Sequence, residues 1–213
     1  MQEMPRSDKK MNSTNLVENK SNNSIFKKIL FSFVWLGVLL FLLDILTKVL
    51  AVNNLVQGER NSYIIPWLSW LFVFTLTFNK GAAFGIGDGD LAAQIVFVVI
   101  SYVVAAAIIV YLCKKYKTTS NFLRATIMVI LAGDLGNAVD RLFAILPINT
   151  IYSNGVIDFV DITGWWKNFG IFNFADACLT VGILMLAVYL IVSSIKEENN
   201  KKTTEVKKWK KNY

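Results

Sequence analysis

The stretch AGDLGNAVDRL, residues 132–142, closes an apolar run that begins FLRATIMVIL at residues 122–131. Charged groups inside a membrane segment are costly and mark functional sites by default. Asn137, Asp140 and Arg141 follow an i, i+3, i+4 spacing and therefore share one face of a helix. The stretch predicts a membrane helix that carries a functional site at one end.

Four apolar stretches are long enough to cross a bilayer, which takes about 20 residues. They cover approximately residues 29–52, 91–113, 125–143 and 171–195. Asp44 and Lys48 interrupt the first stretch, and Asp176 lies near the start of the fourth. Because 54% of the residues are hydrophobic and only 17% are charged, the composition is not that of an ordinary soluble domain. We predict an all-α membrane protein with four transmembrane helices.

A fifth uncharged stretch, residues 63–79, has a different pattern. It contains Pro66, and from Phe72 its β-branched and aromatic residues alternate with a period of two, which is typical of a strand. A single strand cannot satisfy its backbone hydrogen bonds in lipid. We therefore predict a small extracytoplasmic β-cradle, in which this strand pairs with other short strands such as GVIDFVDI at residues 155–162.

The distribution of basic residues predicts the orientation. The two tails and the loop between the second and third spans hold 17 of the 22 basic residues, and such segments remain cytoplasmic. Both termini are therefore expected in the cytoplasm. The net charge of +7 reflects this topology and contact with anionic lipid, and we expect no nucleic-acid partner. The expected parts are a disordered basic tail (1–24), a four-helix membrane domain (25–195) and a second basic tail (196–213).

The missing residue types exclude several kinds of site. The chain has no His, which excludes Ser-His-Asp and Cys-His catalysis and the H-E-x-x-H zinc proteases. The two cysteines, Cys113 and Cys178, lie at opposite ends of predicted spans, so we expect neither a disulfide nor a zinc site. We predict no metal and no cofactor, and any catalysis would depend on carboxylates, Lys, hydroxyl groups or Tyr.

The polar groups of the spans meet near the outer surface in this topology. The third span ends near Asp140 and the fourth begins near Asp176, and each Asp follows an Asn (Asn137 and Asn173) by three residues. Two carboxyl groups at close range share one proton. The ionised member can then act as a base on water, and the protonated member as an acid. The pattern predicts aspartic-protease chemistry with Asp140 and Asp176 as the catalytic pair.

Other interpretations stay open at this point. A charge at a helix end can lie in the membrane interface without any function. An intramembrane Asp cluster also serves small transporters and proton-coupled carriers, although a carrier would place its charges near the middle of the bilayer, in broken helices or repeats. A non-catalytic membrane assembly factor is a third possibility, against which the intact Asp140 and Asp176 argue.

Four sequence blocks resemble those of the lipoprotein signal peptidases, the signal peptidase II family. They are DILTK (44–48), NKGAAFG (79–85), GNAVDR (136–141) and VIDFVDI…FNFADACL (156–179), in the family's order over about residues 29–195. The resemblance implies a four-helix aspartic protease of the bacterial plasma membrane with its active site near the outer surface. Such enzymes cut the signal peptide from a prolipoprotein just before a diacylglyceryl-modified Cys.

The resemblance also assigns residues by position. It again gives Asp140 and Asp176 as the catalytic pair. Positions that match the family motifs support the pair or bind substrate: Asp44, Lys48, Asn79, Gly81, Asn137, Arg141 and Asn173. The implied partners are diacylglyceryl-prolipoprotein substrates and membrane lipid, without a cofactor, and we expect the chain to act as a monomer.

Two features are not explained by the family pattern. Asp134 stands where the family usually has a small residue. It lies six residues from Asp140, so the two side chains point to different faces of the helix. We expect Asp134 to take no part in proton transfer and to be held by a hydroxyl group such as that of Thr180 or Ser32. The connection over residues 146–170, with its turn residues and Trp pair, is predicted as a lid or an anchored surface loop.

Overall fold

The computed structural model describes residues 33–61, 65–81, 90–115, 118–146, 154–164, 166–167 and 169–212. Its elements are four long helices and three short strands with one 3-10 helix: α2 (Val34–Asn54), β1 (Arg60–Asn61), η1 (Pro66–Leu68), β2 (Val73–Asn79), α3 (Leu91–Lys115), α4 (Asn121–Ile145), β3 (Val156–Asp161) and α5 (Phe174–Asn212). All four long helices are apolar enough to cross a membrane. The predicted class, four membrane helices with a small sheet, is confirmed.

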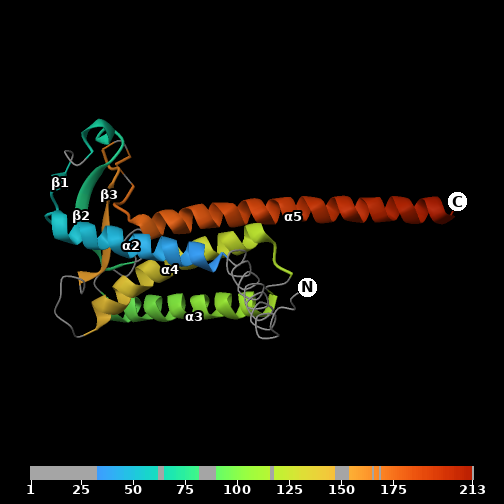
Figure 1. The fold of residues 1–213 in the computed structure, drawn as a ribbon, viewed down its shortest axis with the longest axis horizontal. Helices are drawn as coiled ribbons and strands as arrows, with labels where there is room; N and C mark the ends of the chain where they lie inside the picture. Colours follow the sequence, from blue (N-terminus) through green and yellow to red (C-terminus); the bar gives the residue numbers. More distant parts are fainter. Residues whose placement is uncertain are drawn as a thin grey trace, which may run out of the picture.

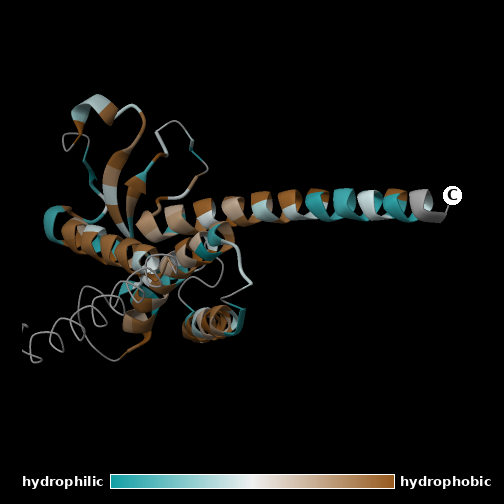
Figure 2. Cartoon of the chain, turned by 45° about the vertical axis from the view of Figure 1, so that its right-hand side comes forward, coloured by the Kyte–Doolittle hydropathy of each residue, from teal (hydrophilic) through white to brown (hydrophobic). Residues whose placement is uncertain are grey.

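Helix α4 lies at the centre of the bundle and packs against α2, α3 and α5 (Figure 1). The hydroxyl oxygen of Ser120 caps its first turn by accepting a hydrogen bond from the N–H of Leu123 at 3.2 Å. Most of α4 is buried, whereas α2, α3 and α5 leave much of their apolar surface exposed, as expected for helices that face lipid (Figure 2). The residues of α4 therefore decide how the other three helices are placed.

Small residues allow α4 and α5 to pack closely. A Cβ atom added at Gly133 would lie 2.5 Å from the carbonyl oxygen of Ala175 and 2.9 Å from Cγ of Leu179. On α5, a Cβ atom at Gly182 would lie 2.5 Å from Cγ1 of Ile130. Lipid tails are as apolar as the helix surfaces, so close van der Waals packing of this kind holds membrane helices together.

The strands form one antiparallel sheet in the order β1-β2-β3, at the end of the bundle where α2 ends and α5 begins (Figure 1). The predicted pairing of β2 with the segment at 155–162 is confirmed, with Phe78 opposite Ile157. The short strand β1 was not predicted. A buried cluster joins the sheet to the last turns of α2: Ala51, Leu76, Ile157 and Phe159.

Asp161 fastens the three strands together. Its carboxylate accepts a hydrogen bond from the hydroxyl of Thr75 on β2 at 2.9 Å and lies 3.2 Å from Nε of Arg60 on β1. The N–H of Thr163 donates to the same carboxylate at 2.8 Å. Burial opposes ionisation of Asp161, but these hydrogen bonds and the Arg60 charge outweigh it and lower its pKa. An ionised carboxylate on β3 therefore links all three strands of the sheet.

Two predicted segments differ from the structure or lie outside it. The fourth span was expected to end near residue 195, yet α5 continues to Asn212. Ion pairs one turn apart stabilise this polar extension, Glu197 with Lys201 at 2.7 Å and Glu198 with Lys202 at 2.6 Å. The predicted lid at 146–170 falls partly outside the described residues, and the amino-terminal tail at 1–24 lies outside them entirely.

We expect Gly133→Ala to lower the stability of the folded protein by about 1–3 kcal/mol, the cost of an overpacked contact. The added methyl group would meet the backbone of α5, which cannot move away as a flexible side chain could. Thermal unfolding in detergent micelles measures the effect. Gly170→Ala is the matched control, since nothing lies within 4 Å of a Cβ atom there. Equal stability of the two variants would contradict the close packing of α4 on α5.

Candidate active site

The ammonium group of Lys48 is the centre of a polar cluster at the sheet end of the bundle. It lies 2.8 Å from a carboxylate oxygen of Asp44, one turn earlier on α2, and 2.8 Å from one of Asp140 on α4. Lys48 and Asp44 are each only 1% exposed. Buried charges of this kind are tolerated only when they are paired and hydrogen-bonded, so the three side chains must assemble together.

The amide groups of α4 and α5 extend this cluster. Nζ of Lys48 also donates to the carbonyl oxygen of Gly136 and to Oδ1 of Asn137, both at 3.2 Å. A Cβ atom at Gly136 would overlap Oδ2 of Asp44, so the glycine makes room for that carboxylate. Oδ1 of Asp44 accepts the N–H of Ala175 at 2.9 Å, which connects α2 to the first turn of α5.

Asp140 is bound as a charge partner of Lys48. It is 5% exposed, and its Oδ2 accepts the N–H of Ile157 on β3 at 3.2 Å in addition to the contact with Lys48. The carboxylate therefore joins α2, α4 and β3. No hydrogen bond or ion pair between Asp140 and Asp176 is found among the described residues.

Asp176 is held by the cap of α5. Asn173 precedes the helix, and its Oδ1 accepts the N–H of Asp176 at 2.9 Å, while the N–H of Asn173 donates to Oδ2 of Asp176 at 3.1 Å. This reciprocal pair is a capping box. Nδ2 of Asn137 donates to the other carboxylate oxygen of Asp176 at 2.8 Å. Asp176 is therefore fixed in position in the first turn of α5.

Asp158 on β3 was not among the site residues predicted from the sequence. It is 2% exposed, and its Oδ1 accepts a hydrogen bond from Nδ2 of Asn173 at 2.7 Å. Burial and then the negative charge of Asp176 raise the pKa of Asp158 to about 8. Asp158 is therefore protonated at neutral pH, beside a carboxylate that lies at a helix N-terminus.

The same amide network positions both carboxyl groups. Nδ2 of Asn173, which binds Asp158, also donates to Oδ1 of Asn137 at 3.0 Å. The side chain of Asn79, at the end of β2, hydrogen-bonds Asp158 from the sheet. Oδ1 of Asn79 accepts the N–H of Gly81 at 3.0 Å. The structure thus brings Asn79, Asn137 and Asn173 around Asp158 and Asp176, and it places Gly81 next to Asn79.

Arg141 and Asp134 lie on the side of α4 that faces α3. The guanidinium of Arg141 is 6.0 Å from the ring centroid of Phe97, and its charge interacts with both Asp176 and Asp158. The hydroxyl group that holds Asp134 belongs to Ser101 on α3. The expectation of Thr180 was wrong, because that hydroxyl donates to the carbonyl oxygen of Asp176 at 2.9 Å. Ser32 lies outside the described residues.

The sequence contains a signal that could have identified Asp158. In VIDFVDI the acidic residue stands inside an apolar strand of a chain that otherwise keeps charges out of its core. Its neighbours Ile157 and Phe159 belong to the hydrophobic cluster, so alternation points Asp158 to the opposite face of β3. This segment was predicted as a strand and belongs to the fourth family block, but no site role was predicted for Asp158.

Comparisons with known proteins agree on one family. The sequence model of signal peptidase (SPase) II matches residues 36–192. A lipoprotein signal peptidase of Coxiella burnetii is 35% identical over 162 residues, which are 76% of this chain and 90% of the relative. One of Halalkalibacterium halodurans is 36% identical over 166 residues, or 77% of this chain and 96% of the relative.

The fold is also similar to that of solved membrane proteins. A bacterial membrane enzyme determined by the in meso method at 2.3 Å resolution matches with a TM-score of 0.61 and 26% sequence identity. The match covers 80% of this chain and 90% of that structure. The similarity therefore extends over most of both chains.

We expect Lys48→Met to destabilise the protein by about 3–5 kcal/mol, the cost of leaving buried charges without their partner. The substitution keeps the length of the side chain but leaves Asp44 and Asp140 facing each other. The midpoint of thermal unfolding in micelles reports the change, and Lys80→Met, at an exposed position, is the control. If Lys48→Met unfolds at the same temperature as the parent, the cluster does not stabilise the fold.

Proposed function

The chain belongs to the signal peptidase II family, and from this premise we propose that the cluster around Asp158 and Asp176 is its catalytic centre. The protein is a membrane protease that removes the signal peptide from prolipoproteins. The carrier alternative is not favoured by these relatives. One observation supports the proposed centre: two neighbouring carboxyl groups have different surroundings. Asp158 is buried and protonated at neutral pH, whereas Asp176 lies in the N-terminal turn of a helix.

We propose an aspartic mechanism with Asp158 and Asp176 as the dyad. Ionised Asp176 removes a proton from a water molecule, and the resulting hydroxide attacks the scissile carbonyl carbon. Protonated Asp158 donates a hydrogen bond to the carbonyl oxygen and stabilises the negative charge that develops there. When the tetrahedral intermediate collapses, the C–N bond breaks and a carboxyl group supplies the proton that the leaving amine takes. Two carboxyl groups with different protonation states are what this chemistry requires.

This assignment differs from the pair predicted from the sequence, Asp140 and Asp176. Asp140 already pairs with Lys48 at 2.8 Å, so its carboxyl group is engaged in the charged cluster and is not free to face a substrate. Its hydrogen bond to the N–H of Ile157 fixes the residue that precedes Asp158. We therefore propose that Asp140 positions strand β3, together with Lys48 and Asp44, and does not touch the substrate.

The remaining polar residues have roles that follow from their contacts. Asn137 and Asn173 orient the dyad, because each donates to one or both of its carboxyl groups. Arg141 places a positive charge near both carboxyl groups and is suited to bind a carbonyl oxygen of the substrate. Asn79 supports Asp158 from the sheet, and the adjoining Gly81 leaves room for the substrate backbone.

The substrate and the topology complete the proposal. We infer that cleavage occurs just before a Cys that carries a diacylglyceryl group, at the outer surface of the bacterial plasma membrane, with both termini in the cytoplasm. Residues 25–195 form the peptidase domain, flanked by basic tails at 1–24 and 196–213, and the chain acts as a monomer. The excess of basic residues in the tails and in the α3–α4 connection supports this orientation.

We expect Asp158→Asn and Asp176→Asn each to lower kcat by at least about 100-fold and up to about 10,000-fold, the contribution of a general acid or base. Asp140→Asn should lower kcat/KM by at most about 100-fold, as a misplacement of the dyad would. Cleavage of a purified diacylglyceryl prolipoprotein in micelles measures all three, with thermal unfolding as a check of folding. Near-normal turnover by either dyad variant would contradict the mechanism.

The pH dependence separates the two possible dyads. The pKa of Asp158 is raised to about 8, and the protonated form is the active one, so kcat/KM should fall as the pH rises through about 8. This alkaline limb should persist in the residual activity of Asp140→Asn and be absent from that of Asp158→Asn. The opposite result would identify Asp140 as the acid, in agreement with the pair predicted from the sequence.

Asp134→Ala should keep kcat/KM within about tenfold of the parent, a change of roughly 1.4 kcal/mol in the barrier. Asp134 is hydrogen-bonded to Ser101 on α3 and makes no contact with Asp158 or Asp176 among the described residues. The same cleavage assay measures it. A loss comparable to that of Asp176→Asn would mean that three carboxyl groups take part in the reaction.

A further inference from the structure

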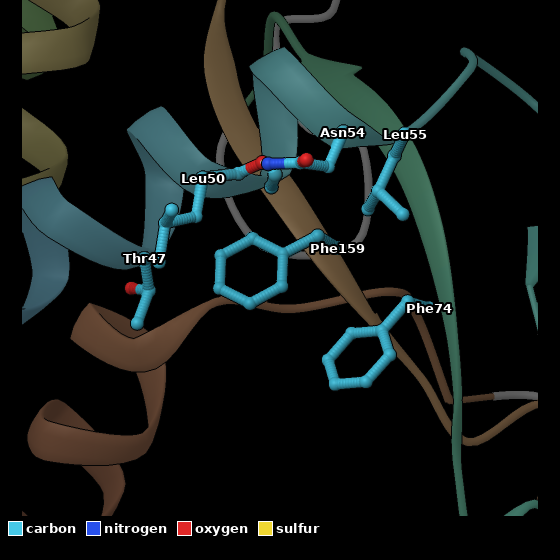
Figure 3. Close-up of a pocket in the computed structure, with 7 residues that line it drawn as sticks. Thr47, Leu50, Asn54, Leu55, Phe74 and Phe159 are labelled. Atoms are coloured by element: carbon cyan, nitrogen blue, oxygen red, sulfur yellow. The ribbon is translucent and has the colours of Figure 1, made fainter. Parts of the chain in front are cut away.

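A cavity of about 560 Å³ lies between the last turns of α2 and the sheet (Figure 3). Its volume is within the range of about 300–1,000 Å³ that is usual for small-molecule sites. Apolar side chains form most of its wall: Leu50, Ala51, Leu55, Phe74 and Phe159. The Phe74 and Phe159 rings stack with their centroids 6.4 Å apart and line the cavity on the side of the sheet.

The two polar residues of the wall offer few hydrogen bonds to an occupant. The hydroxyl of Thr47 donates to the carbonyl oxygen of Asp44 at 2.9 Å. Nδ2 of Asn54 donates to the carbonyl oxygen of Leu50 at 2.8 Å. The Thr47 hydroxyl hydrogen and one N–H of Asn54 are thus satisfied within α2, and the rest of the wall is apolar, so the cavity favours an apolar guest.

The cavity adjoins the proposed catalytic centre at one point and the supporting Lys48 cluster at another. Phe159 directly follows Asp158 on β3, and Thr47 directly precedes Lys48 on α2. Consecutive Cα atoms are about 3.8 Å apart, so only the backbone of β3 separates the cavity wall at Phe159 from Asp158. α2 is one of the membrane helices, and Leu50 is 52% exposed, so the cavity opens toward the lipid side of that helix.

We propose that this cavity holds an acyl chain of the substrate, one of the two on the diacylglyceryl group of its Cys. The inference rests on the proposed function, since it takes the lipidated prolipoprotein as the substrate. The lipid is attached to the residue that follows the scissile bond, so its chains must lie close to the dyad in an apolar environment. Holding one chain against Phe74 and Phe159 aligns the scissile bond with Asp158, and binding energy remote from the reacting atoms is used in this way.

The test compares substitutions that enter the cavity with matched substitutions that do not. Leu50→Trp fills it from α2, and Leu46→Trp is its control, because both leucines are 52% exposed on the same helix and only Leu50 lines the cavity. Asn54→Phe and Asn53→Phe form a second pair. Both asparagines are exposed, and each donates to the carbonyl oxygen four residues earlier at 2.8 Å.

Each variant is assayed in micelles on two synthetic prolipoprotein peptides with the same sequence, whose diacylglyceryl groups carry hexadecanoyl or hexanoyl chains. The parent and both control variants should prefer the long-chain peptide. Leu50→Trp and Asn54→Phe should raise KM for that peptide by about tenfold or more, the scale on which apolar pockets discriminate. Their KM for the short-chain peptide should stay near that of the parent.

Three results would overturn the proposal. If a cavity variant and its control lose activity equally, the effect belongs to the helix surface and bulk phospholipid. If the cavity variants keep the parent's preference for long chains, the acyl chain binds elsewhere. If the parent cleaves neither lipidated peptide, the proposed function fails, and this inference fails with it. In the first two cases the parent still cleaves the peptides, so only the acyl site is rejected.

Discussion

The ammonium group of Lys48, 2.8 Å from carboxylates on two different helices, determines how the functional end of this protein is built. In a buried position each of these charges alone would cost several kcal/mol, so α2 and α4 must meet where they neutralise one another. Asp44 then binds the backbone of α5 and Asp140 that of β3. The elements that carry Asp158 and Asp176 are thereby attached to a charged cluster which has no part in the proposed reaction.

In the proposed mechanism this arrangement separates structural carboxylates from reactive ones. Asp44 and Asp140 face a cation, whereas Asp158 faces amide groups and the charge of Asp176, and burial keeps it protonated. The same strand has an apolar opposite face, where Phe159 lines the cavity proposed for an acyl chain. β3 would then present the acid of the dyad on one face and an apolar wall for the lipid on the other. That arrangement would suit the proposed substrate, a peptide with a diacylglyceryl-modified Cys.

The sequence was sufficient to predict the four membrane helices and the pairing of β2 with β3, because the span length and the alternation of period two are local patterns. It was also sufficient to predict that four polar residues converge, because the alternating direction of the helices brings their positions to the same end of the bundle. These residues are Lys48, Asn137, Asn173 and Asp176. The acidic residue in an apolar strand could have marked Asp158 as a site residue. The proposed division of roles between Asp140 and Asp158 could not be predicted, because it depends on which carboxylate the Lys48 side chain reaches across the bundle. The strand β1 could not be predicted because it has only two residues, too few for any periodic signal. The helical extension after residue 195 could not be predicted because its Glu–Lys pairs also occur in unstructured tails.

The protonation of Asp158 can be measured without any substrate. Carboxyl ¹³C NMR titration of the protein labelled at Asp, in detergent micelles, reports the pKa of each buried carboxyl group. A resonance that titrates near pH 8 should be present in the parent and in Asp140→Asn and missing in Asp158→Asn. If that resonance is instead lost in Asp140→Asn and kept in Asp158→Asn, the acid of the dyad is Asp140, and the division between structural and reactive carboxylates described above is wrong.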